Sequence, residues 1–255
     1  MVTRVLNLVY KEVRGLHQAA YVLALFAFGS QLLALVRDRM LAHQFGAGYE
    51  LDVYYAAFRI PDLMYVLFAS TLSVYVLIPF VAKMREKPKG DVYATQILSQ
   101  VFTLFLVVYV LLAFLLFIFA APIAHVFFPG LSDDPMLVLL LRILLLQPFF
   151  LGISSLFGVV TQLGHRFILY ALSPLIYNLG IIFGITVLEP IMGLSGLAYG
   201  VVIGAFGHMV IQFPFVKKSS LRFAVTHRLS WTILKEILST SLPRAVTLSL
   251  NQIVM

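Results

Sequence analysis

The stretch from Ser30 to Pro79 combines charged side chains with segments that are apolar enough to lie in a membrane. Hydrocarbon does not accept unpaired charges cheaply, so charged groups in or beside membrane helices normally face a protein interior or a water-filled cavity. The charged residues of the stretch are Arg37, Asp38, Arg39, Glu50, Asp52, Arg59 and Asp62. We therefore predict that two helices in this stretch form one wall of a polar cavity.

Helical spacing gathers these side chains on polar faces. Residues seven apart are close to two turns apart on a helix and share a face. Ser30 and Arg37 have this spacing in the first predicted helix, and Asp52 and Arg59 have it in the second. The alternative is that the charges sit at the outer interface, solvated and paired, although interfacial helix ends favour Trp and Tyr over charge clusters. The predicted cavity residues of the two helices are Ser30, Arg37, Asp38, Asp52, Arg59 and Asp62.

Arg142 is a further candidate, because it lies inside the apolar run LVLLLRILLLQPFF. It either extends to the outer interface through its aliphatic stem or faces the interior and pairs with a carboxylate or an anionic ligand. Arginine binds phosphate oxygens bidentately and keeps its charge when partly desolvated. We therefore predict that the cavity holds a lipid-linked phosphate or diphosphate, and that its Asp residues prevent irreversible binding.

Composition assigns the chain to the polytopic membrane proteins. Of its 255 residues, 61% are hydrophobic and 11% are charged, and its mean hydropathy is +0.99, whereas soluble domains average about 25% charged residues. The absence of Cys excludes disulfides and thiolate metal sites, and the six His lack ligand spacing, so we predict no metal or cofactor. The net charge of +7 does not indicate nucleic-acid binding, because basic loops of membrane proteins set topology.

A bilayer core requires about 20 apolar residues per helix. This length predicts an all-α integral membrane fold with six transmembrane helices and the start of a seventh. The expected divisions are an amphipathic cytoplasmic segment (1–18), a six-helix unit (19–216), a basic cytoplasmic loop (217–230) and the beginning of the seventh helix (231–255). The six spans are expected at about 19–41, 53–82, 92–121, 136–163, 167–188 and 192–216.

The charges of the loops predict how the chain is oriented in the membrane, and its small residues predict where helices pack closely. Lys and Arg gather before the first span, between the second and third, and after the sixth, whereas the loops at 125–135 and 189–191 have none. This alternation predicts a cytoplasmic N-terminus. Gly196, Gly200, Gly204 and Gly207 recur at intervals of three or four residues, which predicts close packing of the sixth span against a neighbour.

Two other functional classes are alternatives to transport. A membrane enzyme acting on polyprenyl phosphates needs paired carboxylates or a nucleophile with a base. Asp133 and Asp134 form the only adjacent acidic pair, but they precede Pro135 and are interpreted as the start of a helix. A scaffold that binds membrane lipids or a partner without transporting is the other alternative.

Several motifs of the first 80 residues resemble the start of the MurJ (MviN) lipid II flippases of the multidrug/oligosaccharidyl-lipid/polysaccharide exporter superfamily. They are SQLL at 30–33, VRD at 36–38, FGAG at 45–48, Asp52, AFRIP at 57–61 and Pro79. Weaker similarities continue through Leu141-Arg142-Ile143, Phe157-Gly158, Arg166-Phe167, Pro174, Asn178, Gly196-Leu197-Ala198, Gln212, Pro214, Pro243, Ser249 and Gln252. The similarity thus covers nearly the whole chain.

The resemblance implies a two-lobed transporter that moves an undecaprenyl-diphosphate-linked peptidoglycan precursor across the bacterial inner membrane by alternating access. In that scheme Ser30, Arg37, Asp38 and Asp52 match central-cavity positions, Arg59 matches a basic position and Asp62 a polar one. The chain would supply the first lobe and the start of the seventh helix, so it would need a second lobe to transport.

The chain also departs from the pattern of that family. Gln31 and Tyr65 occupy positions where many members have cavity arginines, Ser70 replaces a common Glu, and Pro148 is shifted by two residues. The missing arginines leave another substrate open within the superfamily, either a different lipid-linked oligosaccharide or a drug.

Overall fold

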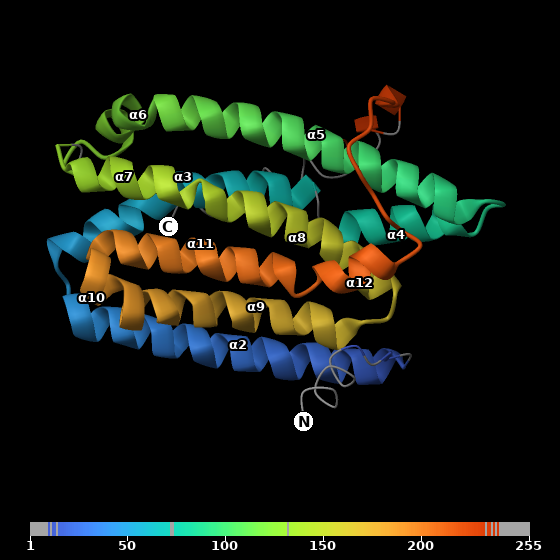
Figure 1. Cartoon of the computed structure of the whole chain (residues 1–255), viewed down its shortest axis with the longest axis horizontal. Helices are drawn as coiled ribbons and strands as arrows, with labels where there is room; N and C mark the ends of the chain where they lie inside the picture. The colour runs from blue at the N-terminus through green and yellow to red at the C-terminus, as the bar shows by residue number, and fades with distance from the viewer. Residues whose placement is uncertain are drawn as a thin grey trace.

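The computed structural model describes residues 15–71, 74–131 and 133–232, together with positions 10, 12, 13, 234, 235, 237 and 239. The described residues form helices and loops with no strand, so the predicted all-α membrane fold is confirmed. The long helices run roughly parallel to one another in an elongated bundle (Figure 1). The predictions for most of the N-terminal segment and of the seventh span, including Pro243, Ser249 and Gln252, fall outside the described residues.

The N-terminal half of the bundle contains α2 (Leu16–Phe45), α3 (Tyr49–Thr71), α4 (Val74–Arg85), α5 (Gly90–Ile118) and α6 (Ala120–Phe127). The other half contains α7 (Pro135–Leu144), α8 (Leu146–Leu163), α9 (Phe167–Phe183), the π-helical segment η1 (Gly184–Leu188), α10 (Glu189–Met192), α11 (Leu194–Val210) and α12 (Phe213–Lys218).

Five helical stretches of the described residues are long and apolar enough to cross a membrane, compared with six predicted spans. They are 16–45, 90–118, 135–163, 167–192 and 194–218. The second predicted span is the difference, and it covers α3 and α4, on either side of residues 72 and 73, which lie outside the described residues. Helix α3 carries Glu50, Asp52, Arg59 and Asp62, and these charges lower its hydropathy. Helix α3 is therefore not among the five apolar stretches, although it carries three of the predicted cavity residues.

Local sequence signals explain where some of these helices begin and end. The side chain of Asp134 accepts a hydrogen bond from the Met136 amide at 2.8 Å, and Pro135 follows at the first helical position of α7. This is the helix start that the acidic pair predicted. Helix α2 ends where Gly46 adopts a φ of 60°, a left-handed conformation that glycine takes without a steric penalty.

Glycines bring α9 and α11 into backbone contact, as the spacing in the sixth span predicted. A Cβ atom added to Gly180 would lie 2.2 Å from the Cα of Gly204, and one added to Gly200 would lie 2.4 Å from the Cα of Gly184. A Cβ on Gly204 would lie 2.5 Å from the carbonyl oxygen of Tyr177. This contact fixes the backbone of α9 at the point where it faces the cavity described below.

The order of the helices leaves α2 attached mainly on one side. Figure 1 shows α2 and α9 side by side along one edge of the bundle, with α11 next to α9 and α5 along the opposite edge. Helix α2 packs extensively against α9 but has little contact with α3. Only Ala19 and Leu41 are buried in α2, and apolar side chains such as Leu25 and Leu35 are exposed. This is the pattern expected of a helix that faces lipid.

Candidate functional site

A cavity of about 440 Å³ lies where the loosely joined α2 and α3 face each other and α9 closes the gap. Its size falls in the range of small-molecule sites. Its lining combines two arginines, two aspartates, three tyrosines and three apolar residues. They are Arg37, Asp38, Arg59, Asp62, Tyr54, Tyr55, Tyr177, Leu41, Phe58 and Ile181.

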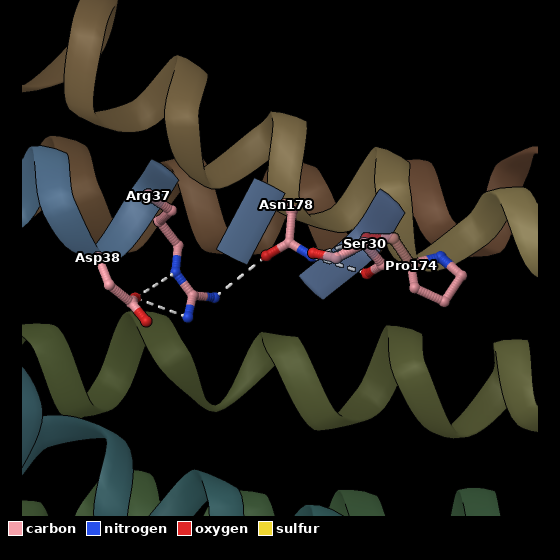
Figure 2. Close-up of polar contacts among 5 residues, drawn as sticks. All are labelled: Ser30, Arg37, Asp38, Pro174 and Asn178. Atoms are coloured by element: carbon pink, nitrogen blue, oxygen red, sulfur yellow. Dashed lines mark hydrogen bonds and ion pairs between the residues drawn. The ribbon is translucent and has the colours of Figure 1, made fainter. Parts of the chain in front are cut away.

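Arg37 extends from α2 toward α9 and is held at two edges of its guanidinium. Its Nε and Nη2 atoms each lie 2.8 Å from Oδ1 of Asp38. Its Nη1 atom donates to Oδ1 of Asn178 on α9 at 3.2 Å. Figure 2 shows Arg37 between these two partners. The side chain of Arg37 is 24% exposed and that of Asp38 is 53% exposed, so the charged pair remains open to water.

Asn178 also binds α2 two turns before Arg37. Its Nδ2 atom donates to Oγ of Ser30 at 3.1 Å and to the carbonyl oxygen of Pro174 at 3.1 Å. Figure 2 shows Ser30 and Pro174 on the side of Asn178 away from Arg37. One amide on α9 therefore joins the two residues of α2 that the seven-residue spacing placed on a common face.

Asp62 of α3 is tied to the rest of the bundle through a buried glutamine. Nε2 of Gln147, the second residue of α8, donates to Oδ1 of Asp62 at 3.3 Å and to the hydroxyl of Tyr177 at 3.1 Å. Gln147 is only 3% exposed, and its Oε1 atom has no hydrogen-bond partner among the described residues. Asp62 is half-buried, whereas Arg59 one turn earlier is exposed.

The structure brings four of the seven predicted site residues to this cavity, namely Arg37, Asp38, Arg59 and Asp62. Ser30 supports the cavity through Asn178 but does not line it. Asp52 is exposed in the first turn of α3 and does not line it either. It lies about 10 Å along the helix from Arg59, at 1.5 Å per residue.

Arg142 lies away from this cavity. Its Nε atom donates to the carbonyl oxygen of Phe117 at 3.1 Å, and its guanidinium stacks 4.9 Å from the centre of the Phe117 ring. Phe117 is near the C-terminal end of α5, where helix carbonyls lack intrahelical partners. Of the two sequence interpretations, the structure favours a role outside the polar interior, with Arg142 joining α7 to α5.

Sequence reasoning missed the tyrosines and amides of the site. Helical spacing and composition do not predict Tyr54, Tyr177 or Gln147, and only the resemblance points to Asn178. Gln147 and Asn178 carried a usable signal, since each is an amide within a strongly apolar segment. The tyrosines carried none, because the chain has 12 of them and most lie outside the cavity.

The lining of the cavity combines hydrogen-bond donors with a balanced set of charges. Guanidinium and phenol groups supply hydrogen-bond donors, and the carboxylates of Asp38 and Asp62 balance the charge. In the part of the chain that the structure describes, no three His, Asp or Glu side chains are grouped so that they could hold a metal ion.

Comparison with known proteins identifies the family of the chain. A sequence model of the family described as "Lipid II flippase MurJ" matches residues 41–255, which is most of the chain. The chain belongs to the MurJ lipid II flippase family. It is therefore a multi-pass membrane protein of a transporter family, as the resemblance in its first 80 residues predicted.

Individual MurJ relatives match the chain over about half of their own length. The probable lipid II flippase MurJ of Buchnera aphidicola subsp. Baizongia pistaciae is 27% identical over 238 residues, which is 91% of this chain and 46% of the relative. The lipid II flippase MurJ of Burkholderia cenocepacia is 27% identical over 213 residues, which is 80% of this chain and 40% of the relative.

Two solved transporter structures resemble the chain in fold, and one of them is a MurJ protein. A structure named "Lipid II flippase MurJ, inward closed conformation" matches with a TM-score of 0.67 and 25% identity, covering 89% of this chain and 47% of its own. A transporter of the MOP superfamily from Pyrococcus furiosus matches with a TM-score of 0.66 at 16% identity, covering 98% of this chain and 55% of its own. The second match shows the fold alone.

Proposed function

We propose that this chain is the N-terminal lobe of a lipid II flippase, and that its cavity holds the diphosphate of an undecaprenyl-linked peptidoglycan precursor. Membership in the MurJ family supports this substrate class. The observation that carries the proposal is the position of Arg37, which projects into an open, water-accessible cavity between membrane helices. A guanidinium there can bind phosphoryl oxygens, which are strong acceptors of charged hydrogen bonds.

Transport in this proposal needs a second lobe. Alternating access is a movement of one repeat or bundle against another around a fixed site. The loose contact between α2 and α3 supports a cavity that changes width as such a movement occurs. We place the protein in the bacterial inner membrane with a cytoplasmic N-terminus, because the basic loops alternate along the sequence.

Binding tests the first part of the proposal. The 255-residue chain is purified into lipid nanodiscs and titrated with undecaprenyl diphosphate, undecaprenol and inorganic pyrophosphate. We expect undecaprenyl diphosphate to bind more tightly than either of the others, since the cavity contacts the diphosphate and the membrane concentrates the chain of the lipid. We expect Arg37→Ala to weaken binding of undecaprenyl diphosphate at least about tenfold, which corresponds to about 1.4 kcal/mol.

Arg39→Ala is the matched control for this experiment. Arg39 is two residues from Arg37, so it lies nearly opposite on α2, and it lines a separate hollow with His43. The Arg39→Ala substitution removes the same charge from the same helix without changing the lining of the cavity. Equal losses in Arg37→Ala and Arg39→Ala, or equal binding of undecaprenol and undecaprenyl diphosphate, would contradict the proposal.

Transport is tested in cells depleted of their own lipid II flippase. We expect growth when the chain is produced together with the second half of a MurJ relative, and no growth when the chain carries Arg37→Ala. Growth that is indifferent to Arg37→Ala would separate the cavity from transport and would leave the family assignment without this mechanism.

A further inference from the structure

We propose that Asn178 is a positioning residue, which fixes the guanidinium of Arg37 so that two of its N–H groups remain available for one phosphoryl group. The inference rests on the proposed function and deepens it. Nothing in the helical spacing of α2 predicts a role for a residue 141 positions away on α9. The role follows from the hydrogen bonds that Asn178 makes on its two sides (Figure 2).

The orientation of the Asn178 amide is determined by its surroundings. Arg37 offers only donors, so the oxygen of the amide has to face it, and a flipped amide would place donors against donors. The nitrogen then faces Oγ of Ser30 and the carbonyl oxygen of Pro174, both at 3.1 Å. Each side of the amide thus requires the same orientation.

This amide leaves a defined part of the Arg37 fork open. A guanidinium has five N–H groups. Asp38 accepts from the N–H group of Nε and from one N–H group of Nη2, and Asn178 accepts from one N–H group of Nη1. With these described partners in place, one N–H group remains on Nη1 and one on Nη2. Two such groups on neighbouring nitrogens match the bidentate geometry in which arginine binds a phosphoryl group.

Asn178 is uncharged, and this leaves the positive charge of Arg37 available to the ligand. Asn178 is 6% exposed and does not line the cavity, so it acts through Arg37 and not by touching the ligand. An amide oxygen orients the guanidinium without neutralising it, which preserves positive charge for the ligand. A carboxylate at the same position would pair with Arg37 and compete with the anion.

This difference gives the central experiment. The affinity for undecaprenyl diphosphate is measured in nanodiscs for the original chain, Asn178→Asp, Arg37→Gln and the double variant. We expect Asn178→Asp to weaken binding about tenfold when Arg37 is present and less than about twofold when it is Gln, because the effect passes through the guanidinium. Equal losses in the two backgrounds would overturn the inference, since a purely structural role does not depend on Arg37.

Two further variants protect the test against misfolding. Asn178→Ala removes the acceptor without adding charge, and we expect a loss of about threefold, smaller than that of Asn178→Asp. Gln212→Leu is the matched control, because Gln212 is also a buried amide that joins two helices, but it contacts α8 instead of the cavity. We expect it to lower the midpoint of thermal unfolding but to leave the affinity of the folded protein unchanged, so that it separates a loss of stability from a loss of binding. An affinity loss in Gln212→Leu as large as that in Asn178→Asp would contradict a specific role.

The outcomes also separate this inference from the function on which it rests. If the original chain binds undecaprenyl diphosphate no better than undecaprenol, the proposed function fails. If the original chain discriminates between them and Asn178→Asp binds like the original, the function stands and the positioning role of Asn178 is wrong.

Discussion

Two of the polar clusters inside this apolar bundle differ in what they leave unsatisfied. The first is the cavity cluster, built around Arg37, Asp38 and Asp62, with Asn178 of α9 and Gln147 of α8 as hydrogen-bond partners. The second is a buried network between α8 and the end of α11, which we call the α8–α11 network. It consists of Ser154, Thr161, His208 and Gln212.

The α8–α11 network is closed on itself. Oγ of Ser154 lies 2.7 Å from Nδ1 of His208 and accepts from Nε2 of Gln212 at 2.7 Å. The hydroxyl of Thr161 donates to Oε1 of Gln212 at 3.2 Å. Ser154, Thr161 and Gln212 are at most 1% exposed. None of their fully buried side-chain nitrogen or oxygen atoms lacks a partner within the described part of the chain.

The cavity cluster is incomplete by the same measure. It contains four charged side chains, Asp38 is half exposed, and the buried Oε1 atom of Gln147 has no described partner. A buried polar network stabilises a fold when every member is satisfied. Charged groups that remain open to a cavity in a membrane protein instead indicate a ligand. The comparison therefore favours a stabilising role for the α8–α11 network, and it supports the proposed binding role of the cavity cluster.

Gln212→Leu should have the largest effect on stability. It removes the residue that joins Ser154 to Thr161, and it leaves their buried hydroxyl groups with fewer partners. Each unsatisfied buried group costs about 1–3 kcal/mol, so we expect the midpoint of thermal unfolding in nanodiscs to fall by about 5–10 °C. An unchanged midpoint would show that the α8–α11 network does not contribute to stability in the way its closure indicates.

Asp38→Asn should have an intermediate effect, and it should strengthen ligand binding without lowering stability. It removes a carboxylate that competes with an anionic ligand for Arg37, while its carbonyl oxygen can still accept from the guanidinium. Exposed ion pairs contribute about 0.2–1 kcal/mol, so we expect affinity for undecaprenyl diphosphate to rise about two- to fivefold. The unfolding midpoint should remain within about 2 °C of the original. Weaker binding would mean that Asp38 orients Arg37 more than it opposes the ligand.

The sequence predicted the cavity face because helical periodicity is a local property. The angular positions of Arg37 and Asp38 on α2, and of Arg59 and Asp62 on α3, follow from their spacing alone. Fold class followed from hydropathy for a similar reason. Helix α3 is less apolar than the predicted span suggests, because a window of 20 or so residues averages apolar segments with the charges between them.

The remainder of the site depends on how helices rotate and slide against one another. Asp52 has the same angular position as Arg59 but lies beyond the cavity in the first turn of α3. Asn178 reaches Arg37 because glycines draw α9 onto α11 and fix its rotation. Neither the axial offset nor the rotation is encoded by the periodicity of one helix, so a single sequence does not give them.

Arg142→Ala should have the smallest effect and marks the limit of the cavity cluster. Arg142 contacts the carbonyl and ring of Phe117, and a partly exposed cation–π contact contributes about 0.5–1 kcal/mol. We expect the unfolding midpoint to fall by about 1–3 °C and the affinity for undecaprenyl diphosphate to stay within twofold of the original. Both are measured in the nanodiscs used for Arg37→Ala. A loss of affinity comparable to that of Arg37→Ala would extend the ligand site to α7, and the division between the cavity cluster and the surrounding frame would then be wrong.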